Sequence, residues 1–176
     1  MNPRVAILVT DGIDRIELDE LYVEIVEHGG IPVLISPKRH RIHAADGCMY
    51  IVDVELGEAD AANYDILLLP GGVISADTLR DNPAAVGLVR AFSRKPIASM
   101  GAAQWLLIEA GMVAGKRVTS TPSIRTDLDN AGAIWSDEPC ATDGLLVTAR
   151  RADDSQVLVL SMLEVLAAQV GRLEVA

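Results

Sequence analysis

The sequence is short of cysteine, basic residues and long apolar runs, and each shortage excludes a class of protein. Its two cysteines, Cys48 and Cys140, form no CxxC motif, so neither a disulfide framework nor a zinc site is indicated. Every apolar run is broken within about ten residues, which is too short to span a bilayer. The formal net charge of -10 opposes binding to a phosphate backbone. We therefore expect a soluble protein that binds neither nucleic acid nor membrane.

Histidine is also scarce. The pair His40 and His43 would project from opposite faces of a strand, so we interpret these residues as surface histidines and predict no metal and no cofactor. Met1 to Thr10 lacks the basic start, apolar stretch and cleavage site of a signal peptide. A cytoplasmic location is therefore expected.

Strands and helices alternate along the 176 residues, which suit a single domain over residues 1–176. Apolar runs predict buried strands, and a short hairpin is expected between the second and third of them. Between the strands, apolar residues recur at helical spacing and predict helices. The alternation predicts an α/β fold with a doubly wound parallel sheet. The expected strands are 4–10, 31–35, 65–69 and 97–99, the hairpin is 40–42 with 48–52, and the helices are 16–26, 77–92, 103–110, 124–130 and 154–170.

Seven short motifs stand in order over roughly residues 4 to 150. They are Asp11 to Leu18, Leu69 to Gly72, Asp77 to Arg80, Lys95 to Ala98, Leu106 to Gly111, Thr119 to Ser123 and Thr126 to Trp135. Together they resemble the PfpI branch of the DJ-1/PfpI superfamily. The resemblance implies a flavodoxin-like, glutamine amidotransferase-like three-layer sandwich that forms a dimer or a higher oligomer. Members of the superfamily are described as intracellular proteases, stress proteins, glyoxalases, deglycases, chaperones and isocyanide hydratases.

The chain departs from this family at the turn that carries its nucleophile. The family reads Ala-Ile-Cys-His-Gly-Pro where this sequence reads Ser-Met-Gly-Ala-Ala-Gln over 99–104. Aligned without gaps, Gly101 stands in place of the cysteine and Ala102 in place of the histidine. A nucleophile elbow needs a positive φ, which glycine adopts without strain. We therefore predict that the turn persists as a degenerate elbow without the thiol.

Glu17 matches the family's acidic residue after the first strand, which hydrogen-bonds the reactive cysteine. In the absence of a thiol its carboxyl group could act as a general acid or base for a bound substrate. The alternative is an inherited carboxylate that only accepts backbone N–H bonds.

The two glycine turns supply the other candidates. Gly71, Gly72, Gly101 and the N–H group of Ala102 could form an anion or oxyanion site at the carboxyl end of the sheet; the alternative is a plain tight turn. The resemblance also places four residues in the pocket: Ile13, Asp14, Asp77 and Trp105. For Asp77 we favour a helix N-cap ahead of Leu79 and Arg80, and for Trp105 a core residue or pocket wall.

Substitute nucleophiles are poorly supported. Cys48 and Cys140 are far from the elbow in sequence, and we interpret them as inert packing residues. Ser99 and Ser123 have no histidine nearby in the sequence to act as a base.

Two functions remain open. The first is a non-covalent acid–base enzyme of isomerase, hydratase/lyase or cyclase type, with Glu17 as proton shuttle for a small carbonyl-bearing metabolite. The second is a catalytically silent member that binds a metabolite or a partner protein through the inherited pocket. We also expect a homodimer, because the first helix carries an apolar stripe of Leu18, Leu21, Tyr22 and Ile25.

Overall fold

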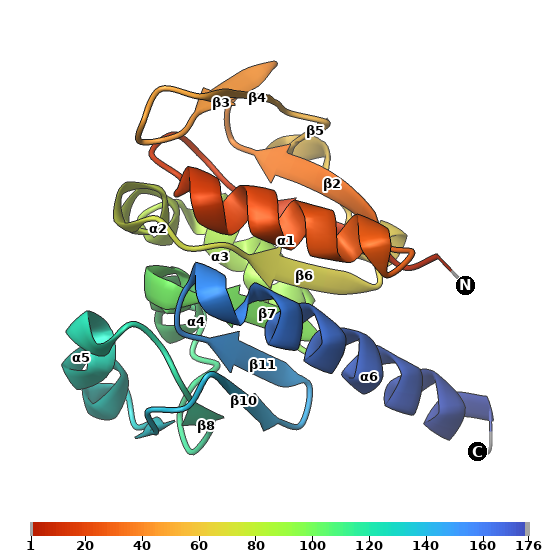
Figure 1. Cartoon of the computed structure of the whole chain (residues 1–176), viewed down its shortest axis with the longest axis vertical. Helices are drawn as coiled ribbons and strands as arrows, with labels where there is room; N and C mark the ends of the chain where they lie inside the picture. Colours follow the sequence, from red (N-terminus) through yellow and green to blue (C-terminus); the bar gives the residue numbers. More distant parts are fainter. Residues whose placement is uncertain (1, 175–176) are drawn as a thin grey trace.

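The computed structural model describes residues 2–174, and its centre is one twisted sheet (Figure 1). Among these residues the sheet has seven strands, and all neighbours are parallel except β10 and β11 at one edge. In spatial order the strands are β10 (Cys140–Asp143), β11 (Leu146–Ala149), β7 (Ile97–Met100), β6 (Ile66–Leu69), β1 (Arg4–Leu8), β2 (Ile31–Ser36) and β5 (Val54–Glu55).

Helices cover both faces of this sheet, so the molecule has three layers (Figure 1). Two long helices lie side by side on one face, α1 (Arg15–Glu27) and α6 (Ser155–Glu174). The other face carries α2 (Val73–Arg80), α3 (Pro83–Ala91), α4 (Gln104–Glu109) and α5 (Arg125–Asn130). The flavodoxin-like α/β fold predicted from the sequence is confirmed.

Each face of the sheet has its own apolar core, because side chains of a strand alternate between the two faces. In β1, Ala6 and Leu8 pack toward α2–α5, whereas Val5 and Ile7 pack toward α1 and α6. The strands that read as continuous apolar runs are therefore buried on both sides.

The apolar stripe of α1 faces inward, which corrects one of our expectations. Leu18, Leu21 and Ile25 are buried in the core beneath α6, and only Tyr22 of the expected stripe is exposed. The stripe exists because the helix must cover the sheet of its own chain. It therefore gives no support to a dimer.

The helix expected over 77–92 is two helices. The first starts directly after the Gly72 turn, and the second begins at Pro83, with the Asn82 side chain accepting from the N–H groups of Ala84 and Ala85. Proline at the first helical position and an asparagine N-cap are strong start signals, and they break the pattern that we had interpreted as continuous.

Shorter elements complete the chain. The predicted hairpin is confirmed as the antiparallel pair β3 (Arg41–His43) and β4 (Met49–Ile51), and a second small pair joins β8 (Arg117–Val118) to β9 (Ile134–Trp135). All three histidines are exposed, as expected. No helix within residues 2–174 is long and apolar enough to cross a membrane.

Candidate active site

The candidate site lies where three neighbouring parallel strands end. β6 pairs with β1 on one side and with β7 on the other, so the segments that follow these strands meet at one edge of the sheet. After β1 comes the loop to α1, with Ile13 and Asp14; after β6 comes Gly71–Gly72, and after β7 comes Gly101–Ala102. The structure thus brings most of the predicted site residues together.

Glu17 is held by the first turn of α1. Asp14 is the N-cap of this helix, and its Oδ1 accepts from the Glu17 N–H at 3.0 Å. A side-chain cap of this kind satisfies one of the free donors at a helix start. The same loop contains Ile13, which is fully buried. The cap fixes the backbone from which the Glu17 carboxyl group projects.

Gly71 leaves room for that carboxyl group. A Cβ placed at Gly71 would lie 1.8 Å from Glu17 Oε2 and 2.7 Å from its Cδ, which is a severe overlap. The next residue, Gly72, has a φ of 102° and its Cβ would lie 2.5 Å from the Asp14 N atom. Both glycines are therefore required by close approach between this turn and the start of α1.

Gly101 adopts the left-handed conformation that the sequence predicted, with a φ of 57°. A Cβ placed there would lie 3.5 Å from Glu17 Oε1 and 3.5 Å from the Arg150 carbonyl oxygen, which is ordinary contact. A side chain at position 101 would therefore point at the Glu17 carboxyl group. The elbow persists as a backbone turn, and both Gly101 and Ala102 are buried.

The surroundings of Glu17 favour its protonated form. Burial is the largest cause, followed by the like charge of Asp14, and together they raise the pKa of Glu17 to about 7. The Gly71 backbone opposes this rise in pKa. Oε2 is buried and has no hydrogen-bond partner among the described residues. Near neutral pH this carboxyl group can both accept and release a proton.

Asp77 is not an N-cap, which corrects our expectation. It lies within α2, whose N-cap is Gly72, because the positive φ at Gly72 lets the helix begin directly after the strand. Its exposed carboxylate pairs with Arg80 at 2.7 Å.

Trp105 is partly buried and lines a surface pocket of about 440 Å³ together with Arg80, Ile108, Asp127, Asn130 and Ala131. Its Nε1 donates to Asp127, and the Arg80 guanidinium lies over its ring. Trp105 thus lines a pocket, but the residues that line it do not include Glu17, so this is not the pocket in which the resemblance placed Trp105.

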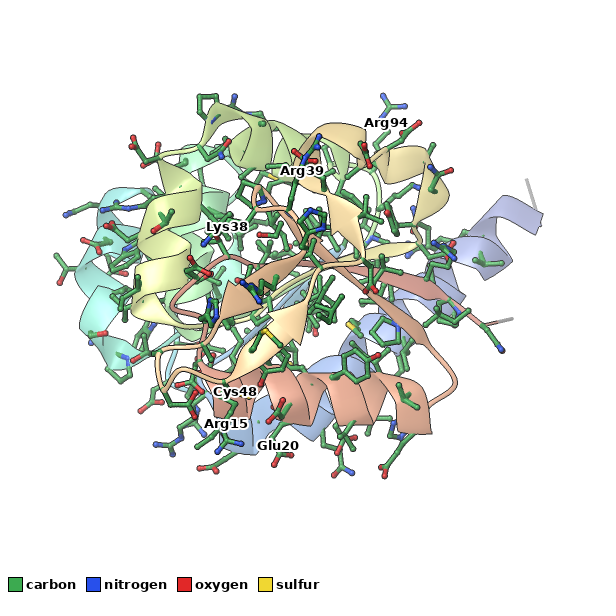
Figure 2. The ribbon with its side chains drawn as sticks, turned by 90° about the horizontal axis from the view of Figure 1, so that it is seen from above. Arg15, Glu20, Lys38, Arg39, Cys48 and Arg94 are labelled. Atoms are coloured by element: carbon green, nitrogen blue, oxygen red, sulfur yellow. The ribbon has the colours of Figure 1, made fainter. Side chains whose placement is uncertain are left out.

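The thiols lie on other elements. Cys48 lies in the turn of the β3–β4 hairpin, next to the start of α1 (Figure 2), and is exposed, so our interpretation of it as a packing residue is wrong. Cys140 is partly buried at the start of the edge strand β10, and burial raises the pKa of its thiol. The Ser99 hydroxyl is buried, and the three histidines lie at the end of α1 and around β3.

Sequence reasoning missed Arg150. Its carbonyl oxygen borders the elbow, while its side chain donates to Asp154 at 3.0 Å and to Asp137 at 3.0 Å. The available signal was its position, since Arg150 directly follows β11 at the same edge of the sheet. Within residues 2–174, no three His, Cys, Asp or Glu side chains are grouped to hold a metal ion.

These observations define a class of protein: a flavodoxin-like sandwich with a partly buried glutamate between two glycine turns. A sequence model of the DJ-1/PfpI family matches residues 3–165, and the chain belongs to this family.

Curated relatives agree with this assignment, and a solved structure shares the fold. The chain is 35% identical over 153 residues to Deglycase TK1284 of Thermococcus kodakarensis, covering 86% of this chain and 92% of that protein. It is 36% identical over 153 residues to Deglycase PYRAB04690 of Pyrococcus abyssi, with the same coverage. Schizosaccharomyces pombe DJ-1 superposes with a TM-score of 0.84 at 22% identity, covering 97% of this chain and 98% of that one.

Proposed function

We propose that this protein is an acid–base enzyme of isomerase, hydratase/lyase or cyclase type that acts on a small carbonyl-bearing metabolite. Glu17 is its proton shuttle, and Gly101 and Ala102 stand in place of the family's catalytic Cys-His pair. We also propose that the whole chain forms a single domain.

The Glu17 carboxyl group is the observation that carries the proposal. Glu17 is partly buried, its Oε2 is buried and unpartnered among the described residues, its pKa is raised to about 7, and it faces Gly101, which carries no side chain. A carboxyl group with a pKa near the working pH is suited to general acid–base catalysis.

The proposed reaction needs only groups of this chain. The Glu17 carboxylate takes a proton from the carbon next to the substrate carbonyl, and the C–H electron pair moves into the enolate. Backbone N–H groups of Gly72 and Ala102 stabilise the negative oxygen. Protonated Glu17 then returns the proton at a second atom of the substrate, which gives isomerisation, or to a leaving group, which gives elimination. Ile13 forms a wall of the site, and Asp14 positions Glu17.

We do not propose deglycase activity for this chain, although two relatives carry that name. A thiol-dependent reaction begins with attack of a thiolate on a carbonyl, and Gly101 has no side chain with which to attack.

Proton exchange tests the proposal without a known substrate. Enolisation in D₂O replaces the protons next to a carbonyl by deuterium, which NMR follows for a panel of small ketones and aldehydes. We expect exchange catalysed by the wild-type protein and slowed roughly 10²–10⁴-fold in Glu17→Gln. Carbonyl compounds that bind but never exchange faster than in buffer would contradict the enzyme and favour the silent binding protein.

We also propose a homodimer, formed through the outward face of the α1 and α6 layer. Beyond Ile16 at the start of α1, the large apolar side chains that are exposed on the described part of these two adjacent helices are Tyr22, Val23, Val26, Val157 and Leu160. Exposed apolar groups that gather on one face mark a contact surface.

A further inference from the structure

Three exposed apolar side chains lie in the segments that carry the Glu17 site. Ile16 is 59% exposed, Val73 59% and Ile74 61%, which are high values for large apolar residues. Each belongs to a segment that builds the site, because Ile16 precedes Glu17 and the other two follow Gly72.

Close contacts bring the start of α2 against the loop that leads to α1. A Cβ placed at Gly12 would lie 2.5 Å from Ile74 Cβ, so Ile74 packs on the loop that leads to α1. A Cβ placed at Gly72 would lie 2.5 Å from the Asp14 N atom. The start of α2 is therefore packed against the start of α1, and we name Ile16, Val73 and Ile74 the apolar rim.

The cations of the surrounding segments are already paired with carboxylates. Arg15 donates to Asp46 at 2.7 Å, Lys38 pairs with Asp11, and Arg150 holds Asp154 and Asp137. An anionic substrate would have to displace one of these carboxylates, and it would also approach a chain with a net charge of -10. Charge thus excludes the anion-binding role that a basic rim would indicate.

We propose that the site takes an uncharged carbonyl compound whose apolar substituent lies on the apolar rim, while its carbonyl group reaches Glu17. The proposal rests on the function proposed above and adds the chemical class of the substrate. Burial of alkyl or aryl surface against Ile16, Val73 and Ile74 supplies the binding energy, and no charged group contributes to it.

Two ketones of equal length test this class. Butyl methyl ketone is neutral, and its analogue with a carboxylate in place of the terminal methyl group is an anion. Their dissociation constants are measured by NMR titration, which needs no turnover. We expect the neutral ketone to bind at least about fivefold more tightly to both the wild type and Glu17→Gln.

Variants of the apolar rim show where the alkyl group lies. Val73→Thr keeps the shape and Ile74→Gln keeps the length, and each should raise the dissociation constant of the neutral ketone about 3–10-fold. Ile134→Gln is the matched control, since Ile134 is 58% exposed on β9, outside the site, and it should leave binding unchanged. These positions are exposed, so the variants should fold, and circular dichroism checks this.

Equal or tighter binding of the anion, absence of ketone binding, or ketone binding that the rim variants leave unchanged would overturn the proposal. A change in oligomeric mass in Ile74→Gln with unchanged ketone binding would assign the rim to a second copy of the chain. Proton exchange that is absent while ketone binding depends on the rim would defeat the proposed reaction but keep the substrate class.

Discussion

Gly71 and Glu17 are packed so closely that a methyl group at position 71 would lie 1.8 Å from Glu17 Oε2. Neither residue can be enlarged without moving the other. The φ of Gly71 is not positive, so the reason for glycine at this position is the carboxyl group beside it and not the backbone.

Gly71→Ala should therefore displace the Glu17 carboxyl group. We expect proton exchange to fall toward the rate of Glu17→Gln, together with a loss of stability of about 1–3 kcal/mol from the overlap. Glu17→Ala makes room for the methyl group, so the two changes should couple by about 1–2 kcal/mol in a double-mutant cycle measured by urea unfolding. Gly87→Ala is the control, because its Cβ meets nothing within 4 Å. Additive effects at positions 71 and 17 would refute the contact.

Glu17 should also make the stability of the protein depend on pH. Its pKa is raised to about 7 in the folded state, above the value of about 4.3 expected in the unfolded chain. Between these values the folded state binds more protons, so the free energy of unfolding falls as pH rises, by up to about 4 kcal/mol.

The free energy of unfolding of Glu17→Gln should not show this fall with rising pH, because the glutamine side chain does not ionise. Its stability relative to the wild type should increase from pH 4 to pH 8, as measured by urea unfolding at both values. A difference between the two proteins that does not change with pH would show that Glu17 ionises as freely as in water.

Alkylation should leave proton exchange intact. Iodoacetamide should modify the exposed Cys48 quickly and Cys140 slowly, because burial raises the pKa of the Cys140 thiol. We expect rates within about twofold of the untreated protein, since neither residue lies on the turn after β7. Loss of exchange on modification, prevented by Cys48→Ser or Cys140→Ser, would identify a thiol mechanism.

Charge on the outer face of α1 should separate the proposed dimer. Val23→Asp and Val26→Asp each bury a carboxylate if this face is an interface, and light scattering should then report the mass of a monomer. Ile51→Asp places the same charge on β4, outside this face, and should keep the dimer. A wild-type protein that is monomeric at micromolar concentration would refute the interface.

The buried strands could be predicted from local composition, and the turn at Gly101 from the resemblance to the family's elbow motif. Runs such as Ile66–Leu69 are apolar throughout and end at a turn motif, and a glycine at an elbow suits a positive φ. The face that α1 presents to solvent could not be predicted, because it depends on α6 packing beside it.

The site was predictable only in part for the same reason. Glu17, Gly71 and Gly101 were found through a motif, but the overlap between Gly71 and Glu17 is a contact between residues 54 positions apart in the chain. Val73 and Ile74 of the apolar rim lay outside the helix expected over 77–92, and nothing local shows that the start of α2 lies on the Gly12 loop.

Asp14 should tune the pH at which Glu17 works. It is the only charged side chain among the causes of the raised Glu17 pKa. From the turn after β6 the Gly71 backbone faces the carboxyl group. The Arg150 carbonyl, after β11, borders Gly101, and the Arg150 guanidinium is held by Asp137 and Asp154. Asp14→Asn keeps an oxygen that can accept from the Glu17 N–H but removes the like charge. The pKa of Glu17 should then fall.

The pH dependence of proton exchange measures this change. If the Glu17 carboxylate is the base, kcat/KM for exchange rises with pH through an apparent pKa near 7 in the wild type and through a lower one in Asp14→Asn. Asp14→Ala also removes the charge but loses the N-cap, so it should show the same pH shift with a loss of stability of about 1 kcal/mol. A purely structural role for Asp14 would lower stability in Asp14→Ala and leave both pH profiles where they are in the wild type, which would contradict the electrostatic coupling of these two carboxyl groups.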